Sequence, residues 1–347
     1  MQASIQQTFS KSSFRSKHKF EFIDLFAGIG GFRIALEPLG GKCVFSSDWD
    51  KYAQETYKAY FGETPRGDIT KINEDEIPQH DVLCAGFPCQ SFSISGKQRG
   101  FKDTRGTLFF DIARIVKFHK PKIVFLENVR NFRYHDKGRT IDVVVKTLQS
   151  LGYNVFYDIL NASYYGVPQA RKRTYILAFR KDLAIRQFEF PQPTYEKVFL
   201  KKFLQPNSKA KNQIIKKGKI KIREQIKTPR NHSLESGLAP IRVGTINDGG
   251  QGERIYSPEG HAITLSAYGG GVASKTGAYL IGKTVRKLTP YECARVMGFP
   301  LDFEIPESVT TNQAYKQFGN SVAIPIIKRI FREIISQTKF YDKKKSS

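Results

Sequence analysis

The chain has 347 residues, a hydrophobic fraction of 40%, and 56 Lys and Arg against 32 Asp and Glu, a formal net charge of +24. This length allows one large domain and a smaller one, and no stretch approaches the roughly 18 apolar residues of a membrane span. The excess of positive charge favours a polyanionic partner, most often nucleic acid, although a lysine-rich surface alone would give the same total.

The first 19 residues are polar and basic and contain no apolar core, so we expect no secretory signal there. The four cysteines, Cys43, Cys84, Cys89 and Cys293, form no Cys-x-x-Cys pair and show no zinc-like spacing with histidine. We therefore expect reduced thiols in a cytoplasmic protein, with no metal site and no membrane association.

The first predicted strand is Phe20 to Ala27, and a glycine-rich turn, Gly28-Ile29-Gly30-Gly31, separates it from a helix. A second strand, 42–47, ends at Asp48, roughly 20 residues after the first glycine, where nucleotide-binding sheets carry an acid for the ribose hydroxyls. A dinucleotide fingerprint would need a third glycine where Arg33 stands. The pattern therefore favours another adenosine-containing cofactor over NAD.

The next elements alternate between strand and helix, which predicts an α/β sheet. Helices are expected at 50–61, 108–118 and 140–150, and strands at 81–85, 122–126, 153–161 and 173–179. Asp68, at a turn before the third strand, is a second acid on the predicted ligand edge. Near the C-terminus we expect helices at 288–297, 313–319 and 322–337.

Two of these strands end in residues that carry chemistry. Gly86 and Pro88 break the third strand, so Cys89 is presented at the carboxyl edge of the sheet, where ligands bind. A lone cysteine is more often a small buried hydrophobe, but its place beside a strand-ending proline disfavours that role. Glu127 ends the next strand, and a carboxylate there is costly unless it has a task or a partner.

Two basic segments accompany these residues. The long stretch 90–107, rich in glycine, serine and basic residues such as Arg105, is interpreted as a mobile lid. Arg171, Lys172 and Arg173 are suited to a phosphate or a base carbonyl, although a solvated charge cluster is the alternative.

The composition changes after Pro191, where a lysine-rich stretch, 201–227, precedes a glycine-rich one, 247–277. Short strands are expected at 253–257 and 261–268. Residues 1–200 and 304–347 are predicted to form one domain, and 201–303 a second domain with the hinge. Three residues of the second domain are suited to contact base edges or phosphate: Gln251, Arg254 and Tyr268.

Several motifs resemble, in the same order, those of the cytosine-C5 DNA methyltransferase family. They are Gly-Phe-Pro-Cys-Gln (86–90), Glu-Asn-Val (127–129), Gln-x-Arg-x-Arg (169–173) and, for the cofactor, Asp-Leu-Phe-Ala-Gly-Ile-Gly-Gly-Phe (24–32) and Gln-Phe-Gly-Asn-Ser-Val (317–322). The match runs from about Phe20 to Ile330. It implies an S-adenosylmethionine-dependent, Rossmann-like α/β sheet and a smaller, mainly β target-recognition domain.

The resemblance assigns the catalytic roles. Cys89 is implied to be the nucleophile that adds to C6 of cytosine, and Glu127 to donate to N3. Arg173 should hold O2 of the base, and Arg171 should brace nearby groups or phosphate. S-adenosylmethionine is converted to S-adenosylhomocysteine without a metal, and the cytosine must leave the duplex. The matched cofactor positions are Phe26, Ile29, Gly31, Asp48, Trp49, Asp68, Ile69, Pro88, Leu108, Asn320 and Val322.

Residues 249–257 and 262–271 resemble more closely the HhaI-type branch of this family, bacterial modification enzymes that methylate GCGC. This implies a monomer that acts on the first cytosine of GCGC in double-stranded DNA, is associated with the nucleoid and protects DNA from a cognate endonuclease. Ser95 and Gln251 should fill the space that the flipped base leaves. Lys97 and Arg99 should contact phosphates. The chain departs most from that branch at 198–239 and in its first 19 residues, and Asp48 replaces a longer Glu, which we expect to alter cofactor geometry slightly.

Three alternatives are weaker. An RNA cytosine methyltransferase of the same fold usually lacks a large DNA-reading domain. The glycine-rich segment around Gln251 indicates that this chain has such a domain and therefore argues against the RNA alternative. A catalytically silent DNA-binding relative would not need Cys89, Glu127, Arg171 and Arg173 intact. A nicotinamide dehydrogenase fails at Arg33 and leaves the basic second domain unexplained.

Overall fold

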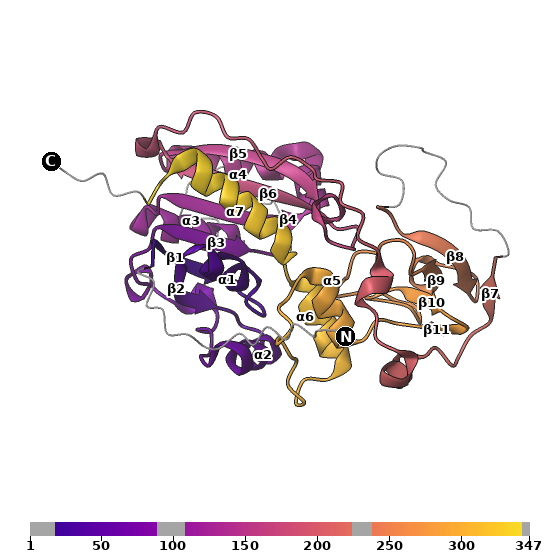
Figure 1. Cartoon of the computed structure of the whole chain (residues 1–347). Coiled ribbons are helices and arrows are strands. Elements are labelled where there is room, and N and C mark those ends of the chain that lie inside the picture. The colour runs from indigo at the N-terminus through magenta and orange to yellow at the C-terminus, as the bar shows by residue number, and fades with distance from the viewer. Residues whose placement is uncertain (1–17, 89–107, 224–237, 342–347) are drawn as a thin grey trace, which may run out of the picture.

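The computed structural model describes residues 18–88, 108–223 and 238–341 (Figure 1). The expected nucleophile, Cys89, and the predicted lid with Ser95, Lys97 and Arg99 lie outside the described residues. None of the helices in the described ranges is both long and apolar enough to cross a membrane.

A six-stranded sheet with the order β2-β1-β3-β4-β6-β5 forms the centre of the larger unit. Its strands are β1 (Phe20–Leu25), β2 (Gly41–Ser47), β3 (Val82–Gly86), β4 (Ile123–Val129), β5 (Tyr153–Asn161) and β6 (Lys172–Arg180). The first four are parallel, and β6 is antiparallel to both β4 and β5. From β1 the chain continues to β2 on one side and later to β3 on the other. This switch point opens a crevice at the carboxyl ends of the strands.

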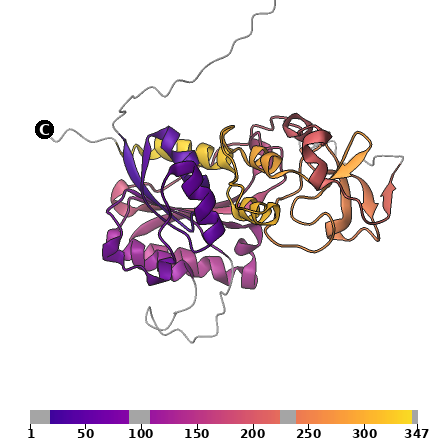
Figure 2. The ribbon, with the colours of Figure 1, turned by 90° about the horizontal axis from the view of Figure 1, so that it is seen from below.

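Helices cover both faces of this sheet (Figures 1 and 2). On one face α1 (Gly31–Leu36) and α7 (Ile324–Thr338) contribute to the apolar core that includes Phe125. On the other face α3 (Leu108–His119) and α4 (Arg139–Ser150) pack over Val124. The central strands β3 and β4 are therefore buried on both sides, which explains why the sequence is continuously apolar there.

A second sheet of five strands lies apart from the first, with the order β11-β10-β9-β8-β7 (Figure 1). Its strands are β7 (Ile220–Ile222), β8 (Ile241–Ile246), β9 (Arg254–Ser257), β10 (Ala278–Ile281) and β11 (Thr284–Arg286). Val243, Ile246 and Ile255 form part of its own small core. Two helices, α5 (Pro290–Met297) and α6 (Thr311–Asn320), lie between the sheets, whereas α2 (Lys51–Phe61) follows β2 in the larger unit.

The predicted strands and helices of the larger unit are present, with small shifts at their ends. The prediction of a strand at 261–268 was wrong, since only Ala262 forms a bridge, to Gln169 in the larger unit. The backbone groups of Ala262 that could pair with a neighbouring strand form hydrogen bonds instead with the loop before β6. Strands β7, β8, β10 and β11 were not predicted. Three of them have only three or four residues, and β7 is wholly exposed.

Candidate active site

The turn after β1 has a backbone that few residues adopt. Phe26, Gly28 and Gly30 have φ values of 56°, 55° and 81°, in the left-handed region that favours glycine. This conformation aims the Gly28 N–H at the Asp48 carboxylate, whose Oδ2 accepts it at 2.7 Å. The other oxygen of Asp48, Oδ1, accepts the Asp50 N–H at 2.8 Å. The sheet thus fixes this acid at the end of β2, beside the glycine-rich turn.

The electrostatics of Asp48 suit a hydroxyl ligand. Burial raises the pKa of this carboxyl, and the two backbone N–H groups partly oppose the rise. Each oxygen still has a lone pair beyond the one it uses. Asp48 can therefore accept further hydrogen bonds from a polar ligand in the crevice.

The surroundings of Asp48 fit a nucleoside. Trp49 is 77% exposed and offers a free aromatic surface, and Gly28 faces open space, since a methyl group added to it would have no atom within 4 Å. Asp68 accepts the Thr70 N–H at 3.1 Å, which holds the neighbouring turn beside the buried Ile69. An adenosine-containing cofactor could stack on the indole and donate its hydroxyls to Asp48.

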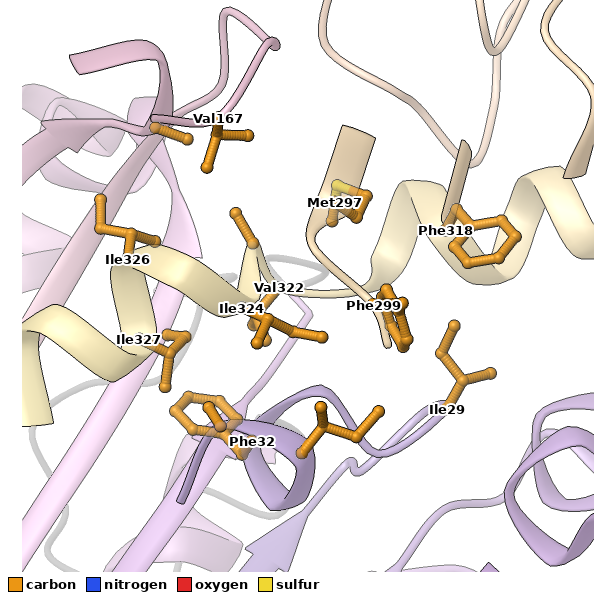
Figure 3. Packing of buried hydrophobic residues seen from close by; sticks show 14 of the residues in the cluster. Ile29, Phe32, Val167, Met297, Phe299, Phe318, Val322, Ile324, Ile326 and Ile327 are labelled. Carbon is orange, nitrogen blue, oxygen red and sulfur yellow. The ribbon is translucent and has the colours of Figure 1, made fainter. Parts of the chain in front are cut away.

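Some of the other expected cofactor positions are accessible to a ligand, whereas others are buried. Phe26 and Leu108 are half-buried, and Pro88 and Asn320 are exposed. Ile29 is only 1% exposed and belongs to the apolar core, so it shapes the turn from behind. In Figure 3, Ile29, Val322 and Phe299 lie in one apolar junction between the glycine-rich turn, the end of α5 and the link from α6 to α7.

Two glycines lie where the glycine-rich turn meets the catalytic edge of the sheet. A methyl group on Gly31 would lie 2.6 Å from Val322 Cγ2. One on Gly86 would lie within ordinary contact distance of both Val322 and Glu127, 3.8 Å from Glu127 Oε2. The cofactor turn, the end of β3 and the Glu127 carboxylate therefore meet at one place.

Glu127 and Arg173 form an ion pair at that place. Glu127 lies opposite Gly86 in the parallel pairing of β3 and β4, and Arg173 lies on β6, opposite Val129. Arg173 Nε is 3.1 Å from Glu127 Oε1, and the side chains are only 12% and 8% exposed. Oε1 accepts no aligned hydrogen bond from a described residue.

Burial raises the pKa of Glu127, although Arg173 and Arg171 both lower it. A carboxyl with a raised pKa holds its proton more readily at neutral pH and can donate it in a hydrogen bond. The geometry therefore provides a proton donor at the sheet edge, with a guanidinium directly beside it.

Arg171 has a different environment. It is 2% exposed, and burial lowers its pKa to about 9. Its guanidinium donates to the carbonyl oxygens of Leu265 and Gly319 at 3.1 Å, and to that of Ser321. Arg171 thus braces backbone from the glycine-rich segment and from the end of α6, and it offers no surface to a phosphate.

Gln169 extends this brace, a role that the sequence did not assign to it. Its Nε2 donates to the Val296 carbonyl at 3.3 Å, and its Oε1 accepts the Leu265 N–H at 3.2 Å. Backbone bonds between Ala170 and Ala262 continue the contact. Gln169 stands in the Gln-x-Arg-x-Arg motif, and that spacing was the available signal. The loop before β6 therefore holds residues 262–265 of the glycine-rich segment.

Two further buried residues escaped the sequence reasoning. Asn128 donates from Nδ2 to the Phe87 carbonyl at 2.9 Å, which holds the backbone two residues before Cys89. Asp24 is 1% exposed, and neither of its carboxylate oxygens has a hydrogen-bond partner among the described residues. Burial raises the pKa of the Asp24 carboxyl well above its usual range.

The expected DNA-reading residues lie on the second sheet and its loops. Gln251 is exposed, Arg254 is half-buried and Tyr268 is 67% exposed. A methyl group on Gly252 would lie 1.9 Å from the Gly270 carbonyl oxygen. Glycine is needed here because the two loops pack backbone against backbone, which brings segments 249–257 and 262–271 together.

No group of three or more His, Cys, Asp or Glu side chains in the described ranges has the arrangement of a metal site. The charged groups that meet at the sheet edge are instead the Glu127 carboxyl and the guanidinium groups of Arg173 and Arg171.

The chain is similar to known proteins over most of its length. The family model of C-5 cytosine-specific DNA methylase matches residues 20–336. Type II methyltransferase M.HhaI from Haemophilus parahaemolyticus is 54% identical over 322 residues, which cover 92% of this chain and 95% of that protein. Type II methyltransferase M.HpaII from Haemophilus parainfluenzae is 43% identical over 332 residues, 92% of this chain and 90% of that one.

The fold is also found among solved structures. The Dnmt2 methyltransferase of S. pombe has a TM-score of 0.68 to this chain at 20% identity, and the match covers 91% of this chain and 98% of that one.

Proposed function

The chain belongs to the C-5 cytosine-specific DNA methylase family, and from this premise we propose that it methylates the first cytosine of GCGC in double-stranded DNA. The methyl donor is S-adenosylmethionine. The biological role is the modification half of a restriction–modification system, which protects host DNA from a cognate endonuclease.

The observation that carries the proposal is the Glu127–Arg173 pair beside Gly86. A cytosine placed there would find a proton donor for N3 in Glu127, whose pKa burial raises. Arg173, 3.1 Å from that carboxylate, would face O2 of the same ring. Together the two groups would draw electron density toward N3 and O2 and make C6 open to attack.

The nucleophile in this proposal is Cys89, two residues beyond the Phe87 carbonyl that Asn128 holds. Its thiolate forms a bond to C6, and the electron pair displaced onto C5 takes the methyl group from the sulfonium. Loss of the C5 proton to a base, through water, then expels the thiolate and restores the aromatic ring. The atoms balance without an oxidant or a metal.

The crevice would bind the methyl donor through residues of this chain. Asp48 accepts the ribose hydroxyls, Trp49 stacks on the adenine, and Asp68 and Ile69 border the ring. Gly28, beside which an added methyl group would have no atom within 4 Å, leaves space for the donor near the turn, whereas Gly31 packs closely against Val322. The bound donor supplies an electrophilic methyl group.

A base inside a duplex cannot reach this buried edge, so the target cytosine must be flipped out. Glu127 is only 6% exposed, which supports that requirement. The specificity for GCGC rests on the resemblance of segments 249–257 and 262–271 to the HhaI-type branch. In this proposal Arg254 and Gln251 donate to guanine edges, and Gln251 also occupies the space that the flipped cytosine leaves.

Covalent trapping tests the proposal. Duplex DNA with 5-fluorocytosine at the target should give a complex with the protein that survives denaturation, because fluorine cannot leave as a proton does. Cys89→Ser should give no such band. A band of equal yield from that variant would contradict the role of Cys89, and transfer of labelled methyl groups to tRNA but not to DNA would favour the RNA alternative.

A further inference from the structure

The lysine-rich stretch has no role in the proposed reaction, and part of it forms an ordered strand. Between residues 207 and 223 the chain has no Asp or Glu and seven basic residues: Lys209, Lys211, Lys216, Lys217, Lys219, Lys221 and Arg223. Strand β7, at the edge of the second sheet, lies within this stretch, and all three of its residues are exposed. The cations are therefore held on a fixed frame.

The register of the sheet places these cations on a particular face. In the antiparallel pairings Lys221 lies opposite Thr245, and Thr245 lies opposite Arg254. Residues that lie directly opposite each other project from the same face of a sheet. Lys219 and Arg223 flank β7, two residues to either side of Lys221. The pairing with β8 continues through them, since the Lys219 carbonyl accepts the Asn247 N–H and the Arg223 N–H donates to the Val243 carbonyl, so they share the face of Lys221. Lys219, Lys221 and Arg223, named here the edge ladder, thus lie on the face of Arg254.

The opposite face is apolar. Ile246 and Ile255 on the two neighbouring strands form part of the small core there. The proposed reading loop lies over the ladder's face, since a methyl group on Gly249 would lie 2.7 Å from Thr245 Cγ2. The edge ladder and the base-reading residues therefore form one continuous surface.

No described residue neutralises the charges of the edge ladder. None of its three residues forms an ion pair with another described residue, whereas Lys201, earlier in the stretch, pairs with Glu259 at 2.7 Å. Glu253 is occupied, because its carboxylate accepts Asn247 Nδ2 at 3.0 Å and the Gly250 N–H at 3.2 Å. Asp248, the other acid at this turn, is exposed and lies beyond the end of β8.

From this arrangement we propose that the edge ladder binds phosphates of the duplex DNA, beside the groove that Arg254 reads. Adjacent strands are about 4.8 Å apart, so the backbone of Lys221 is about 10 Å from that of Arg254. A major groove is about 12 Å wide. A cation two strands away from a base-reading residue therefore reaches the sugar–phosphate backbone that borders the groove. The inference rests on the proposed DNA substrate, and it assigns a contact that carries affinity without base specificity.

Charged side chains on an edge strand have a second possible role, since they prevent edge-to-edge pairing with other chains. That role needs no DNA and predicts that the salt dependence of DNA binding stays the same when the charges are removed. The two roles therefore give different results in the same experiment.

The experiment measures the dissociation constant for a GCGC-containing duplex across salt concentrations, with Lys219→Gln/Lys221→Gln/Arg223→Gln in the full chain. Each phosphate contact contributes about 0.9 to the slope of log K against log salt. Loss of three contacts should reduce the slope by about 2.7, equally for cognate and non-cognate duplexes. Discrimination between the two duplexes should not change. A matched control, Lys120→Gln/Lys146→Gln/Lys181→Gln, removes the same charge from exposed positions of the larger unit, and its effect should be smaller.

A slope equal to that of the wild type, or equal to that of the control, would overturn the proposal. So would increased self-association of the variant with an unchanged slope, because only the edge-protecting role predicts it. The thermal midpoint of each variant shows whether it is folded. Binding is measured without turnover and is therefore independent of catalysis. A wild-type protein that binds DNA but fails to methylate it would contradict the proposed function, and the change in salt slope would still test the edge ladder.

Discussion

The edge of the large sheet and the face of the small sheet both carry arginines, but they hold them in opposite ways. At the large sheet Arg171 and Arg173 are almost enclosed, the first bound to backbone carbonyls and the second to Glu127. On the small sheet Arg254 is half-buried, and the edge ladder is exposed and without ion pairs to the described residues. Arg171 and Arg173 therefore have fixed partners inside the protein, whereas Arg254 and the edge ladder form no ion pair with the described residues.

This difference follows from what each surface must do. A buried charge is screened little by salt and can set the pKa of its neighbour, which chemistry on a base requires. An exposed charge changes its neighbours little but attracts phosphates over a Debye length of about 10 Å at 0.1 M salt. We therefore expect changes at the large sheet to alter turnover and stability, and changes at the small sheet to alter binding and discrimination.

The largest difference between an effect on turnover and an effect on DNA binding should come from Glu127→Gln. This change keeps the shape of the side chain but removes the proton that Glu127 would donate to N3. General acid catalysis contributes about 10²- to 10⁴-fold, so kcat should fall by that range, while the dissociation constant for duplex DNA stays close to that of the wild type. Single-turnover methyl transfer and equilibrium binding on the same preparation measure the two effects. Normal transfer would exclude Glu127 as the donor.

The brace at Arg171 should show the next largest effect, on stability. Arg171→Met leaves three backbone carbonyls without their donor, and each buried unsatisfied group costs about 1–3 kcal/mol. The free energy of unfolding should fall by about 3 kcal/mol or more in denaturant titrations. Arg139→Met serves as the control. It removes a cation that is 67% exposed and pairs only with Asp136 at the surface, so it should change the unfolding midpoint little. Similar midpoints for both variants would mean that Arg171 does not brace the fold.

On the small sheet, Arg254→Lys tests base reading without removing charge. Lysine lacks the planar fork that binds guanine O6 and N7 together, so discrimination against a duplex with one altered base should fall by about 1–3 kcal/mol. The salt slope should not change. Paired titrations with GCGC and a singly altered duplex give the difference, and unaltered discrimination would remove Arg254 from the set of reading residues.

The smallest effect expected is a shift in pH dependence. The pKa of Glu127 is raised above its ordinary value, so the protonated donor is present below that raised pKa and is lost as pH rises through it. Activity should therefore decline on the alkaline side. Because Arg173 lowers this pKa, Arg173→Gln should move the decline to higher pH, whatever the change in maximal rate. Profiles of kcat/KM against pH for both proteins test the shift; a decline that stays at the same pH would show that Arg173 does not tune Glu127.

The larger sheet was predictable from the sequence because its signals are local. Buried parallel strands such as Val82–Gly86 read as unbroken apolar runs, and glycine or proline marks the ends of the first and third strands. Glu127 stood out for the same reason, as a carboxylate at the end of such a run. These features depend on a few adjacent residues.

The remainder depends on contacts between distant segments. Nothing near Arg171 in the sequence indicates that it binds carbonyls at residues 265, 319 and 321. The stretch 261–268 has the composition of a strand, but its partner is the loop before β6. Strand β7 has no buried residue, and the alternation of basic and apolar residues at 219–223 did not stand out from the lysine-rich stretch around it. The edge ladder could be recognised only from the strand register, which places Lys221 on the same face of the sheet as Arg254.

The central claim is that the buried edge of the large sheet methylates a cytosine that the small sheet selects. Bisulfite sequencing of plasmid DNA from cells that express the protein tests this most directly, with Cys89→Ser as the matched control. The account predicts methylcytosine at the first cytosine of GCGC with the wild-type chain, and none with the variant. Methylcytosine concentrated at another sequence would contradict the assigned specificity, and its complete absence with the wild-type chain would contradict the proposed reaction.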